Sequence, residues 1–199
     1  MAMKNIESKI FSSDRDRMLQ AVKCVVAANS AVYISGPITT GKNFVRWYLT
    51  EGMSFPKDSP EYAAAFRTNV LEINELEILD LAKRIRSIDK VAVIEPASLY
   101  IPEWSQVDYI NYWIEIIENF VEKIILVDGW QFSLGCVKEF SFATARNYQI
   151  YSHDGEPISH NCGKEMVLAA SREVKKVSEK NKILTTLAEN LHASVMDKV

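Results

Sequence analysis

Short runs suited to β-strands alternate along the chain with longer segments in which apolar residues recur at helical spacing. The strand-like runs cover residues 31–35, 91–94, 123–127 and 148–152. The run 123–127 is apolar and rich in β-branched residues, which is typical of a strand buried on both faces. Strands that alternate with helices indicate parallel pairing, so the pattern predicts an α/β domain with a parallel sheet.

The segments between and after these runs predict helices. Helices are expected from Ser13 or Asp14 to about residue 28 and over residues 44–49, 74–87, 106–121, 136–147, 165–176 and 180–196. Ser105 is expected to cap the helix that follows it. Residues 51–69 combine glycine, prolines and a short helical run, and form either a lid or a surface decoration. The apolar face of the last helix packs either on the sheet or on a second subunit.

The composition is that of an ordinary globular protein. The 199 residues are 48% hydrophobic and 25% charged, which fits one domain with a sizeable core. A net charge of −3 argues against a nucleic-acid-binding surface. Three widely separated cysteines and three scattered histidines indicate a reduced, cytoplasmic protein without a zinc site. The charged N-terminus and the lack of a run of about 18 apolar residues predict neither a signal peptide nor a membrane span.

The candidate chemistry lies in residues 123–147, which predict a strand, a loop and a helix. The expected helix 136–147 places Glu139 in its first turn, where free N–H groups and the helix dipole favour an ionised carboxylate at neutral pH. The C-terminal edge of a parallel strand is also where open α/β sheets bind ligands. Glu139 is therefore a candidate nucleophile or base. The alternative is an acidic residue that only favours a helix start.

Three segments together resemble one known family. The first is the pattern G-W-x-x-S-x-G-x-x-x-E, formed by Gly129, Trp130, Ser133, Gly135 and Glu139. The others are residues 33–39 (YISGPIT) and 93–97 (VIEPA). In this order the segments resemble the nucleoside 2-deoxyribosyltransferase-like superfamily, which includes the 2'-deoxynucleoside 5'-monophosphate N-hydrolases. The resemblance covers roughly residues 31–155.

The resemblance implies a flavodoxin- or Rossmann-like three-layer sandwich, with four to five parallel strands and helices on both faces. In a single domain of residues 1–199, residues 1–30 would be a helical extension, 31–155 the core and 156–199 C-terminal helices. The sequence pattern does not show the fifth strand that the family usually has. Members of the family commonly complete the pocket from a neighbouring subunit, so a homodimer or higher homo-oligomer is expected.

The resemblance also implies cleavage of an N-glycosidic bond, by hydrolysis or deoxyribosyl transfer, with Glu139 as the nucleophile. Tyr33, at the end of the first strand, would hydrogen-bond and orient Glu139. Glu115 lies 24 residues before Glu139, where the resembling hydrolases hold an acidic residue, usually aspartate. Glu115 would protonate the leaving base or position the sugar. This chemistry requires no metal and no organic cofactor.

The expected substrate is a small-molecule nucleoside or nucleotide. Resembling transferases tend to hold a carboxylate at the position of Ser133, whereas the monophosphate hydrolases hold a serine, so Ser133 favours a nucleotide. Trp130 either stacks on a base or fills the pocket wall. The expected substrate-binding residues are Gly36, Pro37, Ile38, Thr39, Thr40, Trp130, Ser133 and Gly135. The base, the phosphorylation state and the acceptor stay open, and a dinucleotide glycohydrolase would use the same carboxylate.

Residues 36–43 (GPITTGKN) also nearly fit the phosphate-binding loop G-x-x-x-x-G-K-[ST]. Asn43 replaces the hydroxyl that binds magnesium in that motif, and Asp128 is a candidate second metal ligand. One alternative is therefore a nucleoside triphosphate-binding protein. Another is a nucleotide-binding module without turnover, because Glu115 and the missing fifth strand depart from the pattern of the resembling family. In the preferred interpretation the loop approaches a sugar or phosphate, and Lys42 is either a phosphate contact or a solvated lysine.

Overall fold

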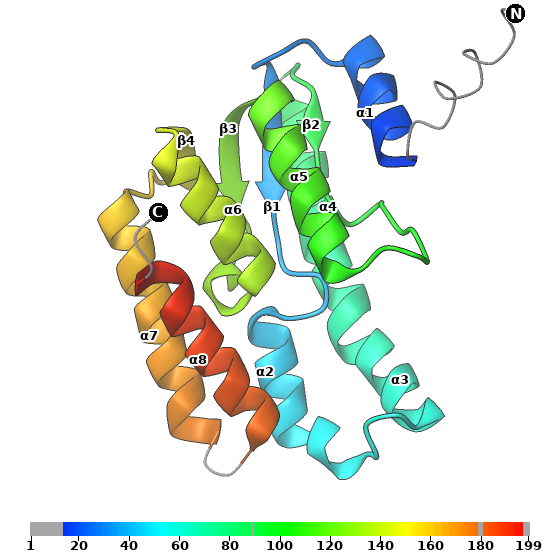
Figure 1. Ribbon diagram of the computed structural model, residues 1–199, viewed down its shortest axis with the longest axis vertical. Coiled ribbons are helices and arrows are strands. Elements are labelled where there is room, and N and C mark those ends of the chain that lie inside the picture. The colour runs from blue at the N-terminus through cyan, green and yellow to red at the C-terminus, as the bar shows by residue number, and fades with distance from the viewer. Residues whose placement is uncertain (1–13, 89, 179–180, 197–199) are drawn as a thin grey trace, which may run out of the picture.

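The computed structural model describes residues 14–88, 90–178 and 181–196, and its centre is a parallel β-sheet (Figure 1). The strands are β1 (Ala31–Ser35), β2 (Val93–Ile94), β3 (Val121–Leu126) and β4 (Gln149–Ser152). Their spatial order is β2-β1-β3-β4, and every pair is parallel. The expected α/β fold with a parallel sheet is confirmed. Because β2 and β3 lie on opposite sides of β1, the winding direction of the chain changes between β1 and β3.

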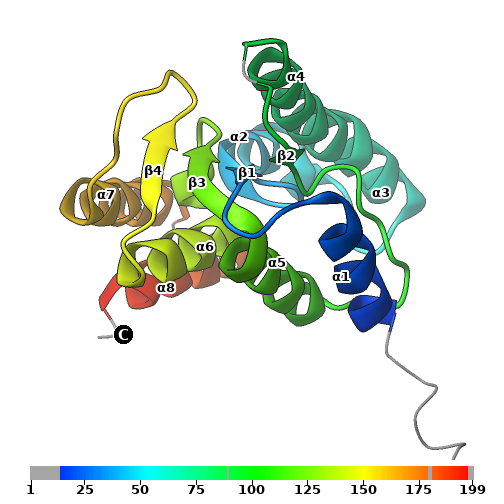
Figure 2. The ribbon, with the colours of Figure 1, turned by 90° about the horizontal axis from the view of Figure 1, so that it is seen from above.

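Helices cover both faces of the sheet and give three layers, as expected (Figure 2). The helices are α1 (Asp14–Val25), α2 (Gly41–Thr50), α3 (Pro60–Phe66), α4 (Glu72–Ile88), α5 (Gln106–Phe120), α6 (Leu134–Ala145), α7 (His160–Ser178) and α8 (Lys182–Met196). Helix α4 lies on one side of the sheet, and α5 and α6 lie on the other. Residues 1–13, part of the expected N-terminal extension, fall outside the described residues. Within the described chain, no helix has the length and apolarity of a membrane span.

Alternation along β1 sends its side chains to two faces. Tyr33 and Ser35 point to the face that carries α6, where both contact one side chain of that helix. Ile34 points the other way and joins a buried apolar cluster with Ile78 of α4. This two-residue period places two polar groups of β1 in the same buried layer.

Helix α5 begins where the sequence predicts, because its first turn forms a capping box. The Ser105 hydroxyl accepts a hydrogen bond from the Asp108 N–H, and the Asp108 carboxylate accepts one from the Ser105 N–H. The observed helix Gln106–Phe120 ends one residue before the expected boundary.

Residues 51–69 contain the expected short helix, α3, which packs against α2. Helix α3 continues through a π-helical turn, Arg67–Leu71, into α4. The rings of Tyr62 and Phe66 on α3 lie 5.2 and 5.6 Å from the ring of Trp47 on α2. These aromatic contacts join the segment to α2, and α4 is correspondingly longer at its N-terminal end than the helix expected from residue 74.

A short return of the chain covers the free edge of β4, where a fifth strand would lie. The Ser152 N–H donates to the Glu156 carbonyl, and the Ile158 N–H donates to the Ile150 carbonyl, both at 2.8 Å. Tyr151 and Pro157 form an antiparallel bridge. The return protects the backbone groups of an edge strand without adding a parallel strand.

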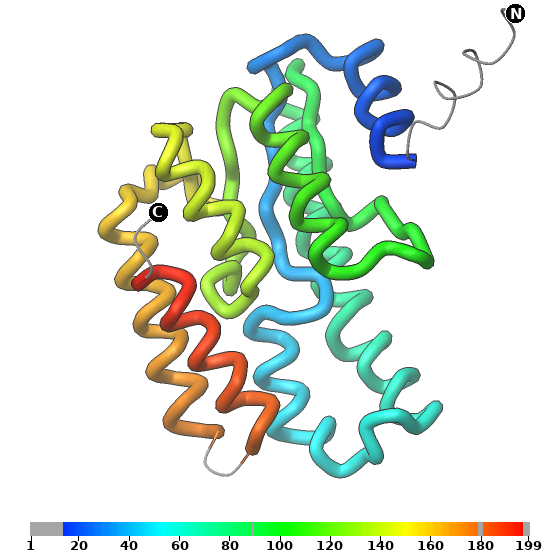
Figure 3. Tube along the Cα trace, viewed as in Figure 1, coloured from blue at the N-terminus to red at the C-terminus, as the bar shows by residue number. Residues whose placement is uncertain are grey.

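The C-terminal helices pack within the chain. Figure 3 shows α8 alongside α7, and α8 also contacts α6. Leu184 and Leu191 are fully buried in the main core, and the Ser171 hydroxyl of α7 donates to the Ala188 carbonyl of α8 at 2.8 Å. The apolar face of α8, expected on the sheet or on a second subunit, thus packs on the helices α7 and α6 of the same chain.

Candidate active site

Glu139 is a buried carboxylate with two hydrogen-bond donors. The Tyr33 hydroxyl donates to Oε1 of Glu139 at 3.0 Å, and the Ser35 hydroxyl donates to Oε2 at 2.6 Å. Glu139 is 6% exposed, and the two donors are fully buried. The contact expected between Tyr33 and Glu139 is therefore present, and Ser35 adds a second one.

The position of Glu139 in its helix differs from the expectation. Helix α6 begins at Leu134, two residues earlier than expected, so Glu139 lies in the second turn, away from the free N–H groups. Burial raises the pKa of Glu139 from 4.5 to about 7, although the hydrogen bonds from Ser35 and Tyr33 lower it. The raised pKa runs against the expectation that Glu139 stays ionised at neutral pH, because desolvation outweighs the two donors.

Cys136 and Ser35 are the site residues that sequence reasoning missed. Cys136 lies one helical turn before Glu139 and is buried. Burial, followed by the charge of Glu139, raises the pKa of the Cys136 thiol to about 12, so the group stays protonated. The signal was available: Ser35 is two residues from Tyr33 on a strand, and Cys136 is three residues from Glu139 on a helix.

Ser133 and Trp130 lie in the loop that enters α6, and both are buried. Ser133 is the residue directly before α6. The ring of Trp130 lies 4.8 Å from that of Phe140, and its N–H has no hydrogen-bond partner within the described chain. Trp130 is thus packed in the core and has no open face for a base.

Glu115 is not brought to Glu139. Its carboxylate forms an ion pair with Arg15 of α1, and 36% of its side chain is exposed. Trp113, two residues earlier on α5, packs against Tyr33 with 5.9 Å between ring centroids. Residues two apart on a helix do not share a face, so the contact of Trp113 with the site turns Glu115 away from it.

The loop after β1 is held tightly. A Cβ atom on Gly36 would lie 2.4 Å from Ile78, so this close approach to α4 requires glycine. The buried side-chain amide of Asn74 donates to the carbonyls of Ile38 and Thr40 at 2.7 and 3.0 Å. Pro37 is buried, whereas Ile38, Thr39 and Thr40 are half-buried. Gly135 lies in the first turn of α6.

The comparisons with known proteins add nothing to this geometry: no family model, no curated protein and no solved structure matches the chain. Within the described residues, no group of three or more histidine, cysteine, aspartate or glutamate side chains is arranged to hold a metal ion.

Proposed function

We propose that the protein cleaves the N-glycosidic bond of a (deoxy)nucleoside or nucleoside 5'-monophosphate, by hydrolysis or deoxyribosyl transfer. One observation carries the proposal: both oxygens of the buried Glu139 carboxylate accept hydrogen bonds, from Tyr33 and Ser35. A carboxylate held in this way keeps one orientation. It occupies the position that the sequence resemblance assigns to the nucleophile.

The reaction follows the two-step logic of a carboxylate nucleophile. An oxygen of ionised Glu139 forms a bond to C1' of the sugar as the bond from C1' to the base nitrogen breaks, and the electron pair leaves with the base. A proton from an acid neutralises the departing base. Water or a second base then forms a bond to C1' and loses its proton to the solvent, as the bond from C1' to Glu139 breaks and the carboxylate is released. Tyr33 and Ser35 orient Glu139, and burial and the charge of Glu139 keep Tyr33 protonated by raising its pKa.

Glu115, the acid implied by the resemblance, can act only when Arg15 releases it. In the ion pair with Arg15 its carboxylate is an acceptor and has no proton to give. The role of Glu115 in the proposal therefore requires release from Arg15 and a rotation of α5 that turns Glu115 toward Glu139.

The test is a chromatographic screen for base release from deoxynucleosides, nucleosides and their 5'-monophosphates, with and without free adenine as acceptor. We expect base release that falls at least about 10²-fold in Glu139→Gln and in Glu139→Ala. Glu165→Gln, at an exposed position of α7, is the matched control and should retain the activity.

Absence of base release by the wild-type protein over the whole panel would reject the catalytic proposal. Tight nucleotide binding without turnover would instead support a non-catalytic binding module.

The free state of Cys24, Cys136 and Cys162 fits the proposed cytoplasmic location. The proposed homodimer or higher oligomer is tested by sedimentation equilibrium.

A further inference from the structure

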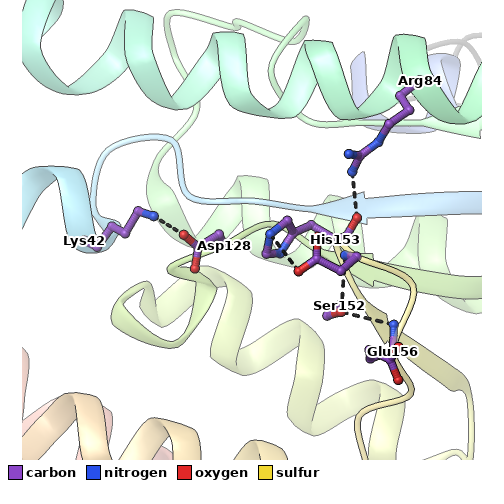
Figure 4. A network of polar contacts seen from close by, with 7 residues as sticks. Lys42, Arg84, Asp128, Ser152, His153 and Glu156 are labelled. Atoms are coloured by element: carbon purple, nitrogen blue, oxygen red, sulfur yellow. Dashed lines mark hydrogen bonds and ion pairs between the residues drawn. The ribbon is translucent and has the colours of Figure 1, made fainter.

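A cleft of about 420 Å³ opens between α4 and the C-terminal ends of β3 and β4. Its size is in the range of small-molecule sites. Its apolar part is Leu81 and Val127, and its ionisable lining is Lys42, Glu77, Asp80, Arg84, Asp128 and His153. Figure 4 shows Lys42, Asp128, His153 and Arg84 around this region. Lys42 begins α2 after β1, and Asp128 follows β3, so the cleft lies at the change of winding direction, where open α/β sheets bind ligands.

The cleft is distinct from the Glu139 site. Tyr33, Ser35 and Glu139 meet on the face of the sheet that carries α6. The cleft is lined by α4 and by Val127, which belongs to the apolar cluster on the opposite face. A ligand in the cleft therefore does not depend on the proposed glycosidase chemistry.

Lys42 lines the cleft and directly follows the loop of residues 36–41. Gly41, with φ of +90°, opens α2, and the first turn of this helix contains no acidic residue and no side-chain cap. Its N–H groups and dipole thus favour an anion. The stem of Lys42 lies over Gly129, where an added Cβ would come within 2.8 Å of it, and its ammonium pairs with Asp128.

Arg84 supplies a second cation from the other side of the cleft. One guanidinium nitrogen donates to the His153 carbonyl at 2.6 Å, which fixes the side chain across the loop after β4 (Figure 4). A guanidinium carries five N–H donors, so this single bond leaves donors for a ligand. The two cations and His153 come from three separate elements and converge on one cleft.

The charges of the lining decide which ligand class fits. Lys42 and Arg84 face three carboxylates, Glu77, Asp80 and Asp128, so the lining carries a net charge of −1 with His153 neutral. The net negative charge of the lining would repel a phosphate alone. Among the described residues, no group of three or more histidine, cysteine, aspartate or glutamate side chains is arranged to hold a divalent cation alone. In a magnesium–phosphate complex, the phosphate can pair with the cations of the lining and the magnesium ion with a carboxylate. Mg²⁺ commonly binds in this way, through one or two carboxylates together with substrate phosphates.

We propose that this cleft binds the magnesium complex of a nucleoside di- or triphosphate, with Lys42 and Arg84 on the phosphates and Asp128 on the magnesium ion. Asn43, which stands where the phosphate-binding loop has a hydroxyl, serves another purpose. Its amide donates to Asn74 at 2.9 Å and to Glu77 at 3.3 Å, and so holds the loop. The carboxylate after β3 takes the place of that hydroxyl as the protein ligand to the metal.

The test is titration calorimetry on the full chain with ADP and with GDP, each in the presence of magnesium. We expect binding of at least one of them, at least tenfold weaker binding of the same nucleotide in EDTA, and no binding of magnesium alone. Magnesium pyrophosphate should bind more weakly than the nucleotide complex. Pyrophosphate binding as tight as that of the nucleotide would overturn the nucleoside part of the proposal.

Variants locate the ligand. Lys42→Ala and Asp128→Asn should each weaken magnesium–nucleotide binding at least tenfold. Arg46→Ala, at an exposed position one turn further along α2, is the matched control and should leave it unchanged. Glu139→Gln should also leave binding unchanged, which separates this site from the glycosidase site. Absence of binding by the wild-type protein, unaltered binding in Lys42→Ala, or loss of binding in Glu139→Gln would each overturn the proposal.

Discussion

At the scale of single residues, the charge of Glu139 is set by two opposing effects. Burial favours the protonated form, whereas Tyr33 and Ser35 donate to the carboxylate and favour the ionised form. Burial is the larger effect and places the pKa at about 7. The proposed nucleophile must be ionised to react, so both the proposed activity and the stability are expected to change near neutral pH.

Removing the shorter hydrogen bond should change the pH dependence of activity. In the wild type, kcat/KM should rise with pH to a plateau with a midpoint near 7, the pKa of Glu139. Ser35→Ala removes a donor that lowers this pKa, so its midpoint should move to higher pH. Ser141→Ala is the matched control, because the Ser141 hydroxyl donates to the Val137 carbonyl on the same helix. An unchanged midpoint in Ser35→Ala would show that Ser35 does not act on the charge of Glu139.

Glu139 should also make folding stability depend on pH. The folded-state pKa of about 7 exceeds the ordinary value of 4.5, so between these pH values the folded chain holds a proton that the unfolded chain has lost. The free energy of unfolding contributed by Glu139 therefore falls as pH rises through this window, by about 3 kcal/mol, and levels off above it.

Urea unfolding of the wild type and of Glu139→Gln between pH 4.5 and 8 measures this contribution. The variant, which cannot ionise at this position, should gain stability relative to the wild type as pH rises. Glu165→Gln should show no such gain. Parallel pH curves for the wild type and Glu139→Gln would contradict the raised pKa.

At the scale of elements, α7 packs against α6. Gly163 of α7 lies against the ring of Phe140, and Phe140 in turn packs on Trp130. A Cβ on Gly163 would lie 2.1 Å from that ring, which is closer than packing allows. This contact sets the position of the helix that carries Glu139.

Gly163→Ala should therefore destabilise the fold by about 1–3 kcal/mol, because overpacking outweighs the better helix propensity of alanine. Gly135→Ala is the matched control on α6. Its added Cβ would have only Ser133 nearby, at an ordinary 3.8 Å, so it should be neutral or slightly stabilising. Urea unfolding of both variants provides the measurement, and equal stabilities would show that α7 does not press on α6.

At the scale of the whole molecule, the C-terminal hairpin of α7 and α8 belongs to the same core as the sheet. Leu184 and Leu191 of α8 share one buried cluster with Tyr33 of β1 and Ile124 of β3. The hairpin should therefore unfold together with the rest of the chain.

Leu191→Ala should lower the free energy of unfolding by about 2–5 kcal/mol and leave a single transition, because it opens a cavity in the shared core. Thr186→Ala, at an exposed position of α8, should change it by less than about 0.5 kcal/mol. A separate, earlier transition of α7 and α8, detected by hydrogen exchange, would contradict a shared core.

The parts of the fold that the sequence predicted depend on local physics. Strand β1 was expected at residues 31–35 and forms there, because a short apolar run is bounded by Asn29-Ser30 and Gly36-Pro37. Helix α5 starts as expected, because its capping box is encoded within four residues. The start of α6 was misplaced by two residues, since Leu134 and Gly135 belong to a segment of turn-forming composition and nevertheless fold into the helix.

The sequence by itself determined the order of strands and helices, the parallel sheet, and the Tyr33 and Glu139 pair that the resemblance points to. The tertiary structure alone decided that Glu115 pairs with Arg15, that Ser35 shares the Glu139 carboxylate, and that Lys42 reaches Asp128. Local patterns encode elements because turns, caps and side-chain periods act over a few residues. Partners, burial and pKa values depend on which distant segments meet, and only packing of the whole chain sets these.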